Sequence, residues 1–140
     1  MNLYTYGTLM APDIMQAVSG CILQSLEATL EGYRRFGIRG EEYPGVIRSK
    51  GGSVEGVLYL DVPPEAMARL DRFEGEMYSR EAVMVHPKGG DRALAAMVYV
   101  IKPEFTHLLT SEEWDFQKFL KHGKRVFEEE YDGFEALDGW

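Results

Sequence analysis

The succession of short β-type runs, most of them joined by turns, is the feature that most restricts what this chain can fold into. Runs rich in β-branched and aromatic residues are bounded by Gly- and Pro-containing turns, at residues 3–6, 27–38, 46–47, 53–61, 78–86 and 93–101. Helical patterns fall between or after them, at 12–18, at 66–74 and from a capping box at 110–113 to about 131. Because most strands follow one another without an intervening helix, the order disfavours a doubly wound parallel sheet. It predicts an α+β fold, in which a small, mainly antiparallel and curved β-barrel is flanked by helices.

The length and charge of the chain limit the classes of partner. Its 140 residues are 45% hydrophobic and carry a formal net charge of −8. This is enough chain for a core of its own, so a single domain over 1–140 is predicted, with 130–140 as a flexible or packing tail. The acidic balance opposes binding to a nucleic-acid backbone or to an anionic membrane surface.

Cysteine usage and the N-terminus bear on the compartment. Cys21 is the only cysteine, so no internal disulfide can form, and a reducing compartment is the natural expectation. The first β-type run begins too close to Met1 for a signal peptide, and no apolar run approaches the length of a membrane span. A cytoplasmic location is therefore predicted.

The N-terminal segment combines a strand, a glycine corner and a helix start. Gly7 follows the strand at 3–6, permits backbone angles closed to other residues and lets a ligand approach the main chain. Pro12 and Asp13 are typical of the first turn of a helix. Such a corner leaves N–H groups free to point at an anion or a polarised carbonyl. On spacing alone, an N-terminal core strand with an ordinary turn is the favoured interpretation, because a single glycine corner is a weak motif.

One carboxylate lies on the apolar face of the second predicted helix. Glu74 falls at helical spacing on the stripe formed by Met67, Leu70 and Phe73. Apolar surroundings and the negative end of the helix dipole both raise the pKa of a carboxyl group, toward the range useful for proton transfer. The alternative is that Glu74 lies at a frayed helix end and reaches water past Gly75.

The sequence gives no pattern for a metal or an organic cofactor. His86, His107 and His122 are far apart, without the short spacings of metal sites. The glycine pairs are not followed by the Lys-Ser/Thr pair of a phosphate-binding loop. No cofactor is therefore expected.

Several motifs, in order along residues 2–101, together resemble one family. They are Tyr6-Gly7-Thr8-Leu9, Tyr43-Pro44-Gly45-Val46, Gly56-Val57-Leu58-Tyr59, Leu70-Asp71-Arg72-Phe73-Glu74-Gly75 followed by Tyr78, and Val98-Tyr99-Val100. The pattern resembles the γ-glutamylcyclotransferase-like family, most closely its AIG2-like branch, which includes γ-glutamylamine cyclotransferases. Motifs in the right order are far more specific than any one of them alone.

The resemblance implies a β-barrel with a pocket at one end. In such enzymes the loop near the N-terminus holds the γ-glutamyl moiety, which would assign substrate binding to Tyr6, Gly7, Thr8 and Leu9. The glutamate of the Asp-x-Phe-Glu-Gly segment is the general acid/base, so Glu74 would be catalytic, and Tyr78 would belong to the pocket. Thr8 stands where many members carry serine, and either hydroxyl can donate or accept a hydrogen bond.

The function implied is a cyclotransferase that acts on a small γ-glutamyl conjugate. The α-amine attacks the γ-carbonyl of the same molecule and releases 5-oxoproline with a free amine or amino acid, an acyl transfer that needs no cofactor. Two other hypotheses are a non-catalytic module that binds a small metabolite in the same pocket, and an interaction protein that docks through its tail, 134–140. The sequence determines neither the amine that leaves nor the oligomeric state.

Overall fold

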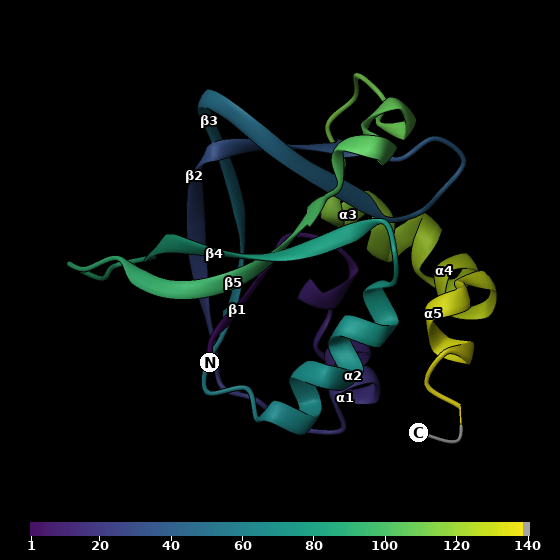
Figure 1. The fold of residues 1–140 in the computed structure, drawn as a ribbon, viewed down its shortest axis with the longest axis horizontal. Helices are drawn as coiled ribbons and strands as arrows, with labels where there is room; N and C mark the ends of the chain where they lie inside the picture. The colour runs from purple at the N-terminus through teal and green to yellow at the C-terminus, as the bar shows by residue number, and fades with distance from the viewer. Residues whose placement is uncertain (139–140) are drawn as a thin grey trace.

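A five-stranded closed barrel forms the centre of the molecule in the computed structural model, which describes residues 1–138. The strands run in the order β1-β3-β2-β4-β5, and parallel pairing of Leu3 in β1 with Met97 in β5 closes the barrel (Figure 1). All other pairings are antiparallel. Their bounds are β1 Leu3–Thr5, β2 Ser25–Gly37, β3 Pro44–Tyr59, β4 Tyr78–Pro87 and β5 Leu94–Ile101. The predicted fold class, a mainly antiparallel barrel with flanking helices, is confirmed.

The two strands predicted at 46–47 and 53–61 are one strand, β3, and the separate assignment was wrong. β3 pairs with β2 along nearly its whole length, from Gly37 opposite Pro44 to Ser25 opposite Tyr59. The register shifts where Glu31 faces Ser53 but Tyr33 faces Arg48, so residues 49–52 form an irregularity opposite Gly32. Such a bulge bends the paired strands. The local glycine signal at 51–52 therefore marks a bend inside a strand.

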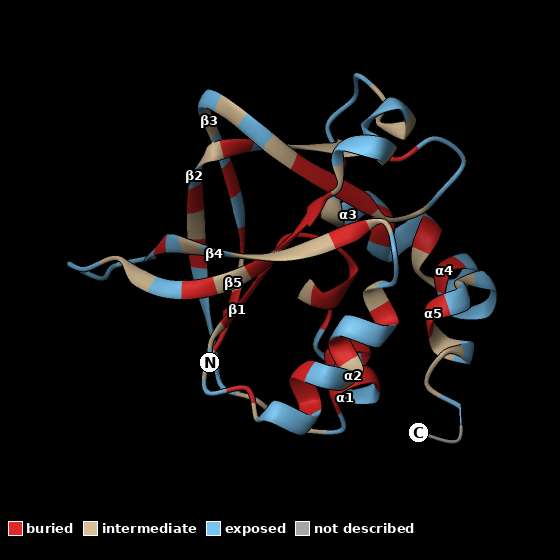
Figure 2. Cartoon of the chain, in the orientation of Figure 1, coloured by how far each residue is buried: buried red, intermediate tan, exposed pale blue. Residues whose placement is uncertain are grey.

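The first two predicted helices are confirmed. α1 spans Pro12–Ser19 and α2 spans Pro64–Glu74. Gly20 and Gly75 follow them with φ of 76° and 79°, the left-handed region that favours glycine after a helix. The two helices contact each other beside the barrel, and their inward faces are buried (Figure 2). Leu70 and Phe73 of α2 are almost fully buried there, which fixes the direction of the residue that follows, Glu74.

The last predicted helix begins later than the capping box suggests. The Thr110 hydroxyl accepts a bond from the Glu112 N–H at 3.3 Å, which closes a turn, and it is Asp115 whose side chain accepts from Lys118 N–H. The helical elements that follow β5 are η2 Pro103–Leu108, α3 Phe116–Lys118, the π-turn η3 Phe119–Gly123, α4 Lys124–Glu130 and α5 Asp132–Glu135. A π-turn adds a residue to the helical repeat and rotates the face that follows. Leu120, within this π-turn, is 38% exposed, whereas Phe119 and Phe127 are buried.

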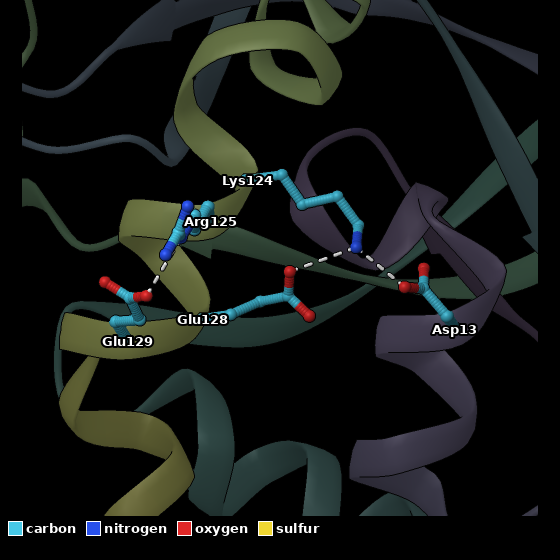
Figure 3. A network of polar contacts seen from close by, with 5 residues as sticks. All are labelled: Asp13, Lys124, Arg125, Glu128 and Glu129. Atoms are coloured by element: carbon cyan, nitrogen blue, oxygen red, sulfur yellow. Dashed lines mark hydrogen bonds and ion pairs between the residues drawn. The ribbon is translucent and has the colours of Figure 1, made fainter.

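The C-terminal segment is docked onto the rest of the molecule by an ion-pair network and by rings. Lys124 at the start of α4 bonds to Asp13 of α1 at 2.7 Å and to Glu128 at 3.0 Å (Figure 3). The ring of Phe134 lies 5.0 Å from that of Phe73 in α2. Gly139 and Trp140, the end of the predicted tail, lie outside the described residues. Within residues 1–138, no helix has the length and apolarity needed to cross a membrane.

Candidate active site

The N-terminal segment is held against the barrel by hydrogen bonds from buried tyrosines. β1 ends at Thr5, and the short helix η1, Thr8–Met10, begins after Gly7. The Tyr6 hydroxyl donates to the Tyr99 carbonyl at 2.6 Å, and the Tyr59 hydroxyl donates to the Leu9 carbonyl at 2.8 Å. Long-range bonds at both ends therefore fix the path of residues 6–9.

Gly7 is required by close packing. A Cβ built on Gly7 would lie 2.9 Å from both Cγ and Cδ of Pro44, closer than real Cβ atoms approach their neighbours. Its φ of −130° lies outside the left-handed region, so contact with Pro44, more than a special φ, excludes a side chain. The first and second motifs named above thus touch at this glycine.

Glu74 ends α2 and directs its carboxyl group into a cavity between α2 and the N-terminal segment. The residue is half-buried, and no hydrogen-bond donor to its carboxyl is found among residues 1–138. Removal from water, and to a lesser extent the charge of Asp71 one helical turn away, raise the pKa of Glu74 to about 8. The direction is the one expected from its place on the apolar stripe, because a desolvated carboxylate without a donor favours its neutral form.

Tyrosines surround this carboxyl, and burial keeps them protonated. Burial raises the pKa of the Tyr6, Tyr78 and Tyr99 hydroxyls, and the negative charge of Glu74 raises it further. Their protons are directed elsewhere: Tyr78 donates to the Pro44 carbonyl at 2.7 Å, and Tyr99 donates to Asp71 Oδ1 at 2.7 Å. The tyrosines therefore exclude water from Glu74 without giving its carboxylate a bond.

The cavity brings every predicted site residue together. Tyr6, Gly7, Thr8, Leu9, Glu74 and Tyr78 all line it, although they come from both ends of a 70-residue stretch. Its volume is about 30 Å³, well below the range of about 300–1,000 Å³ that is typical of small-molecule sites. The residues that sequence reasoning did not assign to it are Tyr4, Thr5, Tyr43, Pro44 and Tyr99. The second and last motifs of the resemblance contain Tyr43, Pro44 and Tyr99, so a signal for these three was present.

Arg35 is a residue beside the site that the sequence did not reveal. Its Nη1 donates to the Tyr6 carbonyl at 2.8 Å and to the Glu55 carbonyl at 3.2 Å, which ties the N-terminal segment to β2 and β3. The guanidinium lies 5.5 Å from the ring of Trp114, and its buried Nε has no hydrogen-bond partner among the described residues. In the sequence it is one polar residue of a β-type run, with nothing to distinguish it from the exposed Arg34 beside it.

A second, more open hollow lies away from this chemistry. It is formed by the bend of β2 and β3 and by residues 111 and 113, and its volume is about 350 Å³. Its lining is mostly polar and includes the exposed Arg34, Lys50 and Glu113, together with Arg35 and Phe36. Glu113, the carboxylate that lines it, is exposed, so the smaller cavity at the half-buried Glu74 is the better candidate for an active site.

Comparisons with known proteins bear on the family and the fold of the chain. A family model described as "Gamma-glutamyl cyclotransferase, AIG2-like" matches residues 3–116. AIG2-like protein D of Arabidopsis thaliana is 32% identical over 136 residues, which cover 91% of this chain and 90% of that protein. A solution structure of another Arabidopsis thaliana protein is similar at a TM-score of 0.69 and 25% identity, over 98% of this chain and 92% of that one. A solved gamma-glutamyl cyclotransferase shares the fold at a TM-score of 0.64 and 14% identity, over 99% of this chain and 86% of that one.

Proposed function

The chain belongs to the AIG2-like gamma-glutamyl cyclotransferase family, and from this premise we propose that it is an enzyme that converts a γ-glutamyl conjugate into 5-oxoproline and a free amine or amino acid. Family and fold support a cyclotransferase-type activity. The roles of individual residues and the course of the reaction are our proposal. The observation that carries it is a glutamate of raised pKa facing the main chain of residues 6–9 across one small cavity.

Glu74 acts first as general base. The α-ammonium group of the substrate cannot attack until it loses a proton, which the Glu74 carboxylate accepts. The freed amine attacks the γ-carbonyl carbon of the same molecule and closes a five-membered ring, an intramolecular step that avoids the entropic cost of joining two molecules. At pH 7, a pKa of about 8 leaves roughly one Glu74 in ten as the carboxylate. The same pKa makes its protonated form a competent acid for the next step.

The tetrahedral intermediate carries a negative oxygen, which main-chain N–H groups of residues 6–9 stabilise. As the bond to the leaving nitrogen breaks, Glu74 returns a proton to that nitrogen, and its carboxylate then accepts the extra proton of the ring nitrogen and passes it to the released amine. Two protons of the α-ammonium group finish on the leaving amine, one remains on the lactam nitrogen, and no net proton is released. Tyr78 and the other buried tyrosines contribute by keeping water out of the cavity, which strengthens these interactions.

The proposal includes a small γ-glutamyl compound as the partner and a reducing, cytoplasmic setting. The single cysteine, Cys21, is free and half-buried, which is consistent with a reducing compartment. The acidic net charge of −8 gives no support for nucleic acid as a partner.

A screen of γ-glutamyl compounds for release of 5-oxoproline, run with the Glu74→Gln variant, tests the proposal. Gln has nearly the shape of Glu but cannot carry the proton, so we expect kcat to fall at least about 1,000-fold while the fold is kept. Glu65→Gln is the matched control, because Glu65 is exposed in the first turn of the same helix. If Glu74→Gln retained turnover, Glu74 could not be the general acid/base. Binding of 5-oxoproline without turnover of any conjugate by the native protein would favour the metabolite-binding module.

A further inference from the structure

The open hollow at the bend of β2 and β3 concentrates positive charge on an acidic protein. Over the whole chain, 15 lysines and arginines are outnumbered by 23 aspartates and glutamates. The lining of this hollow reverses the balance: it contains one carboxylate and three cationic side chains, which are Arg34, Arg35 and Lys50. A local excess of positive charge in a concave surface raises the concentration of anions there.

The shape of this hollow depends on two glycines of β3 that line it. Gly51 has a φ of 81°, in the left-handed region that favours glycine. A Cβ on Gly52 would lie 2.5 Å from the Tyr33 carbonyl oxygen and 2.7 Å from Cγ of Arg34, closer than real Cβ atoms approach their neighbours. The volume of about 350 Å³ falls within the range of small-molecule sites. The bend therefore forms a hollow of defined shape that is large enough for a small organic ligand.

Arg35 brings unused hydrogen-bond donors to the hollow. Its side chain is only 11% exposed, and its Nη1 is occupied by the carbonyls of Tyr6 and Glu55. Its buried Nε has no hydrogen-bond partner among residues 1–138. Within the same residues, Nη2 meets only the carboxylate of Glu113, at 3.6 Å, which is longer than a hydrogen bond, and that side chain is 67% exposed. Buried polar groups are normally paired, so two guanidinium nitrogens without a close acceptor point to an anion.

The rest of the lining supplies donors of the kinds that hold phosphate groups. Arg34 and Lys50 are exposed, and neither has an ion-pair partner in the part of the chain that the structure describes. Three hydroxyl groups also line the hollow, those of Ser49, Ser53 and Ser111. Guanidinium, ammonium and hydroxyl groups together form a set of donors that phosphate oxygens accept from.

We propose that this hollow binds a small phosphorylated metabolite, whose phosphate group is held by Arg35, Lys50 and the serine hydroxyls and displaces the Glu113 carboxylate from Arg35. A phosphate monoester carries nearly two negative charges and three acceptor oxygens, so it uses more of these donors than a single carboxylate can. A phosphate group alone would leave most of the volume unfilled, so the ligand also has an organic body. The inference does not rest on the proposed cyclotransferase activity.

The guanidinium of Arg35 also connects the hollow with the cavity at Glu74. Its Nη1 donates to the Tyr6 carbonyl at 2.8 Å, and Tyr6 lines that cavity. A phosphate group that binds Arg35 from the hollow changes the surroundings of a side chain that holds residues 6–9 in place. Occupation of the hollow is therefore detectable at residues 6–9.

Titration calorimetry on the full-length protein tests the class of ligand, with glucose 6-phosphate, inorganic phosphate, citrate and glucose as probes. At constant ionic strength and about pH 7.5, a phosphate monoester is mainly a dianion. We expect glucose 6-phosphate to bind with a Kd of about 1 mM or lower, and glucose at least about tenfold more weakly. Citrate that binds as tightly as glucose 6-phosphate would overturn the assignment to phosphate. If neither glucose 6-phosphate nor inorganic phosphate bound saturably at about 20 mM, the site itself would be overturned.

Removal of the two exposed cations tests the location. In the double variant Arg34→Ala, Lys50→Ala, which leaves Arg35 in place, the Kd for glucose 6-phosphate should rise at least about tenfold. The double variant Lys88→Ala, Arg125→Ala is the control, because it removes the same net charge from exposed positions outside the hollow. It should change the Kd by no more than about twofold, since distant surface charges are screened. Equal weakening in both variants would mean attraction by net charge alone and would overturn the hollow as the site.

Glu113→Gln tests the displacement of the built-in carboxylate. The variant removes the negative charge beside Arg35, so the Kd for glucose 6-phosphate should fall about threefold. Glu112→Gln is the matched control, because Glu112 is the exposed neighbouring carboxylate and does not line the hollow. An unchanged or higher Kd in Glu113→Gln would overturn the role given to Glu113.

Backbone amide signals in NMR spectra show where the ligand binds. Addition of glucose 6-phosphate should shift the signals of residues 49–53 most, and those of residues 7–9 less, over the same range of concentration. Changes at 7–9 with none at 49–53 would place the phosphate in the cavity at Glu74 and overturn the inference. Changes at 49–53 with none at 7–9 would support the site and overturn its link through Arg35. All of these measurements are made without turnover, so their failure would leave the proposed cyclotransferase activity standing.

Discussion

The two ends of the chain meet at Glu74, and they are held there by different forces. Residues 6–9 are tied to the barrel by a buried hydrogen bond from Tyr59 to Leu9 and a partly buried one from Arg35 to Tyr6. The C-terminal segment is held by rings, by Tyr131 and by the partly exposed ion pairs of Lys124. Buried long-range bonds fix a main chain closely, whereas ring packing and exposed ion pairs tolerate more change.

The difference suggests a division of tasks in the proposed enzyme. The wall that must present N–H groups to a developing charge needs a fixed geometry, because small displacements are costly in catalysis. The C-terminal segment holds the end of α2 in place by packing. Changes on the N-terminal side should therefore reduce activity with every substrate, and changes on the C-terminal side should act mainly on stability.

Among the changes that separate the two sides, Gly7→Ala should reduce activity the most. The added methyl group would lie 2.9 Å from the Pro44 ring, so residues 6–9 or Pro44 must move. We expect kcat/KM for every accepted substrate to fall about 100-fold, because the N–H groups leave their positions. Gly90→Ala is the control, since a Cβ there would have ordinary contacts with Pro87 at 3.4 Å in an exposed loop. A loss limited to one leaving group would contradict the division.

The pH dependence should follow the Glu74 carboxyl. Below pH 8 the carboxylate is protonated, so kcat/KM should fall about tenfold per pH unit. Carbon-detected NMR of labelled glutamate carboxyls, with Glu74→Gln to identify the signal, separates this group from the substrate ammonium. A midpoint near 4.5, the ordinary value, would contradict the burial argument.

The same pKa has a consequence for stability. Between pH 4.5 and about 8 the folded protein keeps a proton on Glu74 that the unfolded chain has lost, so stability decreases as pH rises through this window and is level above it. At pH 9 the buried charge should cost on the order of a few kcal/mol. Glu74→Gln should therefore unfold at a higher denaturant concentration than the native protein at pH 9, and the difference should shrink at pH 5.

Arg35→Lys should have a smaller effect, through the position of the N-terminal segment. Lysine keeps the charge but loses the fork that bonds the Tyr6 and Glu55 carbonyls. We expect a fall of about five- to tenfold in kcat with all substrates, and little change in the apparent pKa of the pH profile. Arg34→Lys, on the exposed neighbour, provides the comparison. Equal losses in both variants would argue that Arg35 acts only on the stability of the barrel.

Tyr131→Phe should have the smallest effect on activity. The variant keeps the ring, which packs on Phe73 and Tyr43, and removes the hydroxyl that donates to the Phe73 and Glu74 carbonyls. We expect a loss of about 1 kcal/mol in the free energy of unfolding, measured by urea denaturation, and a change in kcat of no more than about threefold. A loss in kcat as large as that of Gly7→Ala would mean that both sides control the chemistry.

Much of the architecture and the central residues of the site were readable in the sequence. The periodicity of Met67, Leu70 and Phe73 placed Glu74 on a buried helix face, and the motif order linked it to residues 6–9. Arg35 was missed because a charged residue in a strand gives no local sign of which face it occupies or of which carbonyl it will reach. The late start of the last helix was missed because Thr110 uses its hydroxyl in a turn, an alternative that the same residues allow.

What the sequence determined by itself is therefore local: where strands and helices form, where glycines end the helices, and which carboxylate lies on an apolar stripe. Tertiary structure decided that β3 is continuous, that Arg35 reaches the Tyr6 carbonyl, and that Tyr131 and Gly133 close a groove over the end of α2. The physical reason is the distance along the chain between the residues that interact. Propensity and periodicity act over a few residues, whereas these contacts join segments far apart in the chain, which meet only when the barrel closes and the C-terminal rings pack against it.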